Sequence, residues 1–164
     1  PCSLLVLTNQ RKDLEKLLAT TITMIHLKGS TLDHTIIEKH EVTDVWNDVK
    51  DLVAKTNDDV LNEKDILEYL KSGHFILWIG TETDSDNILF AMTIHFAYYP
   101  KHKMCRVATI AGERMKDWID ETLLELENWA KAQGCDYMDM YARRGWKKIL
   151  KEYKEDCILL RKKL

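Results

Sequence analysis

The chain has 164 residues, of which 45% are hydrophobic and 31% are charged, and its formal net charge is −3. This size and composition predict one globular domain with a hydrophobic core. The charge balance excludes a strongly basic surface that would attract nucleic acid, and no apolar run in the sequence reaches the length of a membrane span.

Cysteine and histidine spacing argues against a metal site. The four cysteines, Cys2, Cys105, Cys135 and Cys157, are far apart and form no CxxC pair, and no two histidines are spaced as HxH or HxxxH. A structural zinc site needs ligand pairs at short spacing. We therefore expect free thiols in a reducing cytosol, no metal and, since no secretory signal opens the chain, a cytoplasmic protein.

The first 72 residues predict a mostly helical half. Residues 3–8 form a short apolar run typical of a strand, and apolar residues then recur at helical spacing over 11–29. Residues 30–42 fit neither pattern, so a strand and a helix both stay open there.

Two more helices are predicted before residue 73. Valines and leucines at positions 45, 49, 52 and 53 share one helical face, with Thr43 or Asp44 as the cap. Asn62 is the expected cap of a short third helix, which ends at Ser72-Gly73.

Three apolar runs with short links follow and predict an antiparallel meander. Residues 74–79 are continuously apolar, as in a strand that is covered on both faces. Residues 88–99 and 103–110 form the other two runs, separated by Pro100, and the polar segment 81–87 forms the first turn.

The rest of the chain predicts a strand–helix–strand crossover. A long amphipathic helix follows Gly112 directly, and its apolar face consists of Met115, Trp118, Ile119, Thr122, Leu126 and Trp129. Residues 135–141 alternate as a strand, which a right-handed crossover places parallel to 103–110. A short basic helix over 143–153 and a closing strand over 157–164 are expected at the end.

Several motifs in the second half are distinctive. They are LKSGHFILWIG, RVATIAGERMKDW, LENWAKAQGCDYMDMYARRGWKKIL and CILLRKKL. Together with the order of the elements, they resemble the GNAT acetyltransferase superfamily, and most of all the GNAT-like proteins of tailed bacteriophages. Those proteins share the strand that ends in a Leu-Ala-Gly-like turn, the Trp-Ala pair, the Gly-Cys-Asp strand start and the Arg-x-Gly-Trp turn.

The resemblance implies an α/β fold with a GNAT-like mixed sheet, containing an antiparallel meander, a central amphipathic helix and a parallel crossover strand. It implies one domain, with residues 1–72 as a helical acceptor-side half and residues 73–164 as the sheet and coenzyme-A-side half.

The resemblance also implies an acetyl-CoA site at TIAGERMKDW, residues 109–118, where a strand passes into a helix. Backbone N–H groups at a helix start lack partners and carry partial positive charge, so they bind phosphates. Ile110, Ala111 and Gly112 are the expected backbone contacts, and the side chains of Arg114 and Lys116 are the expected cationic contacts.

The loop departs from the family pattern, Arg/Gln-x-x-Gly-x-Gly/Ala, because it has a single glycine and two nearby acids, Glu113 and Asp117. Acids in a first helical turn stabilise the helix and repel a polyanion. Two interpretations stay open. One is a shortened cofactor loop beside a cleft between strands 103–110 and 135–141, and the other is a self-capped helix start that holds no ligand.

Acetyl transfer to an amine needs a base, a donor for the oxyanion, which in this family is commonly a fourth-strand N–H, and an acid for the leaving thiolate. The family often uses a Tyr in the last short helix as that acid, but Leu150 aligns there. Tyr153 and Tyr141 are the remaining candidates, and surface packing is the alternative role of both. His95 and Glu82 are the candidate bases, and a structural role is the alternative for His95.

A dense basic run follows the strand predicted over 135–141. Its members are Arg143, Arg144, Lys147, Lys148, Lys151 and Lys154. It suits the 3′-phosphate of coenzyme A, another phosphate or an acidic protein, and a solvated helix face is its alternative role.

The sequence thus predicts a phage-encoded, acyl-CoA-dependent N-acetyltransferase that acts on a small-molecule or protein amine in the host cytoplasm. The alternative is a GNAT fold without catalysis, which serves as a binding or virion-associated structural protein with a phage or host partner, or as an inhibitor of a host enzyme. No membrane or nucleic acid partner is expected.

Overall fold

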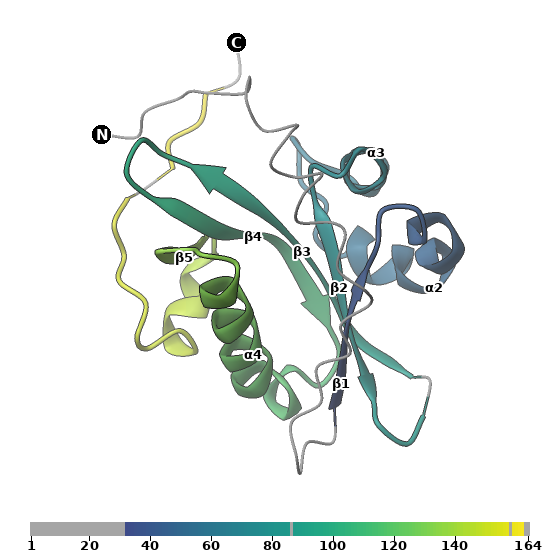
Figure 1. Cartoon of the computed structure of the whole chain (residues 1–164). Coiled ribbons are helices and arrows are strands. Elements are labelled where there is room, and N and C mark those ends of the chain that lie inside the picture. Colours follow the sequence, from purple (N-terminus) through teal and green to yellow (C-terminus); the bar gives the residue numbers. More distant parts are fainter. Residues whose placement is uncertain (1–31, 86, 158, 163–164) are drawn as a thin grey trace.

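In the described part of the chain, a mixed sheet of five strands, in the order β1-β2-β3-β4-β5, lies at the centre of the computed structural model (Figure 1). The structure describes residues 32–85, 87–157 and 159–162, so the strand predicted over 3–8 and the helix predicted over 11–29 lie outside the described residues. The strands are β1 (Leu32–Ile37), β2 (Ile76–Glu82), β3 (Ile88–Tyr98), β4 (Lys103–Gly112) and β5 (Tyr137–Met140).

Neighbouring strands are antiparallel except β4 and β5, which are parallel. The predicted mixed sheet, with its meander and its parallel crossover strand, is therefore confirmed. Residues 30–42, which the sequence left open, contain the strand β1 and the start of the following helix.

Helices α2 (Val42–Ala54) and α3 (Glu63–Ser72) cover one face of the sheet, and α4 (Ile119–Ala132) covers the other (Figure 1). Strand side chains alternate between the two faces. Leu77 of β2 accordingly packs with α2 and α3, while its neighbour Trp78 packs with α4. The predicted apolar face of α4 is confirmed at Ile119, Thr122 and Leu126, which are buried.

The two short helices before β2 begin differently. At α3, the Asn62 side chain accepts hydrogen bonds from the N–H groups of Lys64 and Asp65, and Gly73 ends the helix at φ 77°, so the predicted cap and the predicted end are both confirmed. At α2, the predicted cap at Thr43 or Asp44 is wrong, because the helix begins earlier, at Val42. Val42 is buried with 1% exposure, and this packing draws the chain into the helix before either polar residue.

The connection after β4 is longer than predicted. β4 continues to Gly112, a short 3₁₀ helix η1 occupies Met115–Asp117, and α4 starts only at Ile119. The helix predicted directly after Gly112 is therefore wrong. The chain stays paired with β3 past the end of the strand, because the Glu113 N–H donates to the Leu89 carbonyl at 2.9 Å.

The chain end also differs from the prediction. The basic segment forms only a short 3₁₀ helix, η2 (Arg144–Lys148), instead of a helix over 143–153. The closing strand over 157–164 is wrong for its described residues, none of which is in a strand. Leu159 and Leu160 are 60% and 88% exposed, so no strand of the described residues covers this apolar run.

Candidate functional site

β4 and β5 pair along only part of β4. Residues 104–107 of β4 lie opposite residues 137–140 of β5, but β4 runs on to Gly112 while β5 ends at Met140. Beyond Val107, β4 therefore has no strand on its outer side in the described part of the chain.

A bulge marks the point where the two strands part. Thr93 of β3 lies opposite Thr109, whereas the next residue, Ile94, lies opposite Val107, so Ala108 has no partner on β3. An extra residue of this kind bends and twists its strand. The bulge thus turns the end of β4 away from the line it shares with β5.

The backbone of β4 beyond the bulge presents hydrogen-bonding groups to this uncovered edge. In an antiparallel pair, residues that exchange hydrogen bonds alternate with residues that exchange none. Since Glu113 bonds to β3 through Leu89, Ala111 also faces β3, and Ile110 and Gly112 direct their N–H and C=O groups outward. Two of the three predicted backbone contacts therefore point toward the uncovered edge.

Gly112 is required by packing on its other side. A Cβ atom at this position would lie 2.5 Å from the Leu89 carbonyl oxygen and 2.6 Å from the ring of Trp118. Trp118 stacks on Phe90 with 4.5 Å between ring centroids, and its indole N–H donates to the Glu113 carbonyl at 2.6 Å. The glycine therefore lets the Trp118 ring lie flat against the end of β4.

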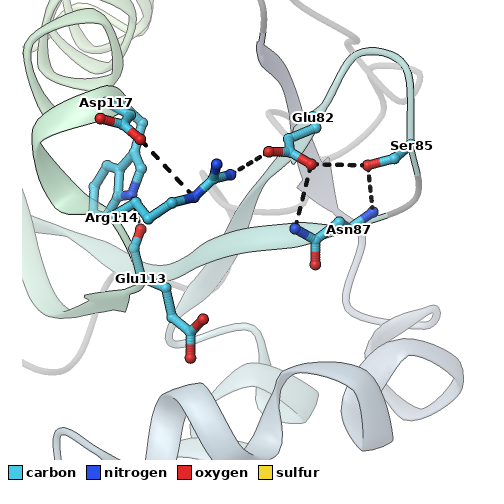
Figure 2. Close-up of polar contacts among 7 residues, drawn as sticks. Glu82, Ser85, Asn87, Glu113, Arg114 and Asp117 are labelled. Carbon is cyan, nitrogen blue, oxygen red and sulfur yellow. Dashed lines mark hydrogen bonds and ion pairs between the residues drawn. The ribbon is translucent and has the colours of Figure 1, made fainter.

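Figure 2 shows Arg114 reaching from the loop after β4 to the turn between β2 and β3. Its backbone is left-handed, with φ 50°, and its guanidinium forms an ion pair with Glu82. Its Nε lies 3.9 Å from Asp117 Oδ2. The hydrogen bond to Glu82 is the main reason that the pKa of Arg114 is raised. This predicted cofactor contact is thus already paired with acids of the same chain.

The other charged residues of the loop are exposed. Glu113 pairs with Lys55, at the end of α2, with 3.3 Å between Nζ and Oε1. Lys116 is exposed and has no ion pair within the described residues. No side chain caps α4, and the acids of its first turn are Asp120 and Glu121. The expected capping of this helix by Glu113 and Asp117 is therefore wrong, because both precede the helix.

A second group of polar side chains, which includes the candidate base His95, lies on the opposite face of the sheet from α4. His95, Arg106 and Asp139 are directly opposite one another across β3, β4 and β5. The Arg106 guanidinium donates two hydrogen bonds to Asp139, at 2.7 and 2.6 Å. The Tyr141 ring lies 4.9 Å from the guanidinium carbon, and the Phe75 ring lies 5.3 Å from the His95 ring.

His95 is neutral at physiological pH. Burial, and after it the positive charge of Arg106, lowers its pKa from 6.5 to about 4. A neutral imidazole has a ring nitrogen that can accept a proton, but a pKa of about 4 makes this candidate a weaker base than a group whose pKa lies near the working pH. The other candidate, Glu82, has its pKa lowered by its hydrogen bond to Arg114, and that ion pair occupies its carboxylate.

The two candidate acids lie on different faces. Tyr141 follows β5 and is 63% exposed beside Arg106. Tyr153 packs against the α4 layer, and its hydroxyl donates to Glu127 of α4 at 3.2 Å. Burial raises the pKa of Tyr153, which keeps its proton in place. Leu150, at the position where the family often has its tyrosine, is a buried core residue with 7% exposure.

The basic run is only partly paired. Lys147 lies 2.7 Å from Glu155, and Lys154 lies 3.5 Å from Asp156. Four further members are exposed and have no ion pair within the described part of the chain: Arg143, Arg144, Lys148 and Lys151.

The sequence reasoning missed the pair of Arg106 and Asp139. The signal was present, since each is a charged residue inside an otherwise apolar strand. Only the register of β4 against β5 joins them. The buried hydroxyls of Thr93 and Thr109, 2.7 Å apart, were missed for the same reason.

No group of three or more His, Cys, Asp or Glu side chains in the described residues is arranged to hold a metal ion. Cys105 and Cys135 are free thiols, and burial raises the pKa of Cys105 to about 12. None of the described helices is both long enough and apolar enough to cross a membrane.

The chain matches no protein family model, and no curated protein sequence matches it. Solved structures are similar in fold. A GNAT family acetyltransferase from Staphylococcus aureus has a TM-score of 0.58 at 14% identity, covering 82% of this chain and 100% of that one. Glucosamine-6-phosphate N-acetyltransferase from Arabidopsis thaliana has a TM-score of 0.60 at 13% identity, covering 82% and 99%.

An aminoglycoside acetyltransferase from an uncultured soil metagenomic sample, in complex with sisomicin, has a TM-score of 0.60 at 10% identity and covers 82% of this chain and 97% of its own. At these identities the likeness shows the fold alone. The chain has the GNAT acetyltransferase fold.

Proposed function

We propose that this chain is an acyl-CoA-dependent N-acetyltransferase. The fold supports the use of acyl-CoA, and the uncovered outer edge of β4 is the observation that carries the proposal. An extended ligand with amide groups adds to such an edge as a strand does, by main-chain hydrogen bonds. Ile110 and Gly112 offer those groups, and they suit the amides of a pantetheine arm.

Three groups of residues carry out phosphate binding, proton removal from the amine and proton donation to the sulfur. When bound, acetyl-CoA supplies a thioester carbon that the acceptor nitrogen attacks, and its sulfur leaves with the electron pair. Lys116 and Arg114 hold phosphates at the loop after β4. His95 accepts the amine proton through water, since its ring is unprotonated at neutral pH. Tyr153 or Tyr141 returns a proton to the leaving sulfur.

Thermal unfolding with and without acetyl-CoA tests the cofactor. A ligand at a hundred times its Kd adds about 2.7 kcal/mol to the free energy of unfolding, so the melting temperature should rise. Lys116→Glu should reduce this rise by reversing a charge in the loop. Lys101→Glu, the same change in the exposed turn between β3 and β4, should leave the rise intact. No rise for the wild type at millimolar acetyl-CoA contradicts the proposal.

The acid is tested by comparing Tyr153→Phe with Tyr141→Phe. Each change removes one hydroxyl and keeps the ring. The variant with the larger fall in transfer rate, at unchanged acetyl-CoA affinity, identifies the acid. If neither hydroxyl matters, the sulfur leaves without a proton from these residues.

An amine is the acceptor class that the fold supports. Glucosamine 6-phosphate and an aminoglycoside are the first acceptors to test, since proteins of similar fold carry those names. A phage origin, and a location in the host cytoplasm or the virion, stay predictions.

The alternative function is a GNAT fold that binds a protein partner without catalysis. The pairing of Arg114 with Glu82 favours it, because this cation is already occupied. This alternative would be supported if the wild-type protein shows no change in melting temperature with acetyl-CoA but co-purifies with one phage or host protein.

A further inference from the structure

An acid beside the turn between β2 and β3, Glu82, contacts the candidate cofactor loop after β4. Glu82 is the last residue of β2 and is far from Arg114 in the sequence. Its carboxylate nevertheless forms an ion pair with the Arg114 guanidinium, and the hydrogen bond between them is the largest cause of the raised pKa of Arg114. Figure 2 shows the two side chains pointing toward each other from their separate elements. The contact joins the meander to the loop that precedes α4.

The Glu82 carboxylate is held from its own side of the contact. The Ser85 hydroxyl donates to it at 3.1 Å, and the Asn87 amide donates to it at 3.4 Å. The backbone closes the same turn, since the Glu82 N–H donates to the Asn87 carbonyl at 3.2 Å. The carboxylate is therefore positioned before any ligand arrives.

The Arg114 backbone is also fixed. A left-handed conformation is uncommon for a residue with a side chain, and here the Arg114 carbonyl accepts the Asp117 N–H at 2.8 Å. The preceding residue, Glu113, is bonded to β3 through Leu89. The side chain thus leaves the loop toward the turn that carries Glu82.

A cavity of about 510 Å³ lies where the turn and the loop meet. Its lining carries three carboxylates and a single cation: Glu82, Asp84, Asp117 and Arg114. An approaching phosphate meets net negative charge there while Arg114 is paired. Separation of Glu82 from Arg114 exposes the cation and removes the competing acid from it.

We propose that Glu82 sets the affinity of this loop for the cofactor phosphates, by competing with them for Arg114. This inference rests on the proposed use of acyl-CoA. Exposed ion pairs contribute little each, so the expected effect is a two- to fivefold change in the dissociation constant, about what such a pair is worth. Glu82 thus modulates cofactor affinity from a position outside the loop that carries Arg114.

Titration calorimetry with acetyl-CoA, at low salt, tests the inference on the wild type and four folded variants. Glu82→Gln should bind about two- to fivefold more tightly than the wild type. Asp84→Asn, in the same cavity with the same change of charge but no ion pair to Arg114, should bind as the wild type does. Arg114→Gln should bind more weakly, and Glu82→Gln should add nothing to it in the double variant.

The double variant separates competition for Arg114 from plain charge repulsion. If Glu82→Gln tightens binding equally with and without Arg114, or if Asp84→Asn tightens it as much, the inference is wrong while the cofactor assignment stands. If the wild type and every variant fail to bind millimolar acetyl-CoA, the proposed function itself is wrong, and the role of Glu82 falls with it. Tighter binding of acetyl-CoA by Glu82→Gln than by the wild type, without the same gain in Asp84→Asn or in the double variant, supports both the proposed function and the role of Glu82.

Discussion

His95 shows how single residues acquire their chemistry from neighbours. It stands opposite Arg106 in the sheet, beside the Phe75 ring, and the charges that act on it come from Arg106, Asp139 and His74. Burial is the largest cause of its low pKa, and Arg106 adds to it, while Asp139 acts in the opposite direction. The result is a neutral imidazole within a row of charged groups.

This pKa predicts a pH dependence of stability. Between about pH 6.5 and pH 4 the unfolded chain binds a proton at His95 that the folded chain does not. The free energy of unfolding therefore falls as the pH falls through this window, by up to about 3 kcal/mol. His95→Asn should lose this part of the dependence in urea unfolding, whereas His102→Asn, an exposed histidine, should keep it. Parallel pH curves for wild type and His95→Asn would contradict the prediction.

At the scale of elements, the junction of β4 with α4 determines the shape of the candidate site. β4 parts from β5 after Val107, and the chain then passes Gly112 and η1 before α4 begins. Trp118 lies at the start of α4 with 1% exposure and packs back on Phe90 of β3. The junction is thus fixed by packing on one side and leaves the strand edge uncovered on the other.

Gly112→Ala tests this packing. The added methyl group would meet the Leu89 carbonyl and the Trp118 ring at distances that real Cβ atoms do not reach. Overpacking of this kind costs about 1–3 kcal/mol, and it should be measured as a lower urea midpoint. Gly145→Ala is the matched control, because its Cβ meets nothing within 4 Å. Equal midpoints for the two variants would mean that the junction is looser than described.

At the scale of the whole molecule, the sheet separates two sets of residues. Tyr153 lies in the α4 layer, whereas His95 lies across the sheet beside Phe75, which packs with the α2 and α3 layer. The uncovered edge of β4 runs between these layers. The edge proposed for the cofactor and the candidate base His95 therefore lie in different places in the fold.

This separation predicts separable kinetic effects. His95→Asn should lower kcat by about 10²–10⁴, the usual contribution of a general base, and leave the Kd for acetyl-CoA unchanged. Steady-state rates and calorimetry on the same preparations check both values. A weaker Kd with unchanged kcat would place His95 at the cofactor instead.

Much of the fold could be predicted from local patterns. Asn62 and Gly73 marked the ends of α3 because capping needs particular residue types at particular places. The apolar runs of β2, β3 and β4 and the alternating run of β5 gave the meander and the crossover, since these patterns reflect burial. The closing strand failed because an apolar run also needs a neighbouring strand, and pairing is not a local property.

The candidate site could be predicted in part. The motif TIAGERMKDW predicted the position of the loop between β4 and α4. Its single glycine, however, makes room for the Trp118 ring, and α4 begins only at Ile119. Nothing local to Glu82 or Arg114 indicates that they meet, nor that Arg106 meets Asp139. Each of these contacts joins residues from separate elements.

The sequence by itself therefore determined the order of the helices and strands from α2 to β5, the mixed character of the sheet and the region of the candidate cofactor loop, because periodicity and caps depend on neighbouring residues. Only the tertiary structure decided where β4 leaves β5, which amides face the uncovered edge, and which acid holds Arg114. Those features depend on strand register and on a bulge at Ala108. A shift of one residue in register would turn every side chain of a strand to the other face.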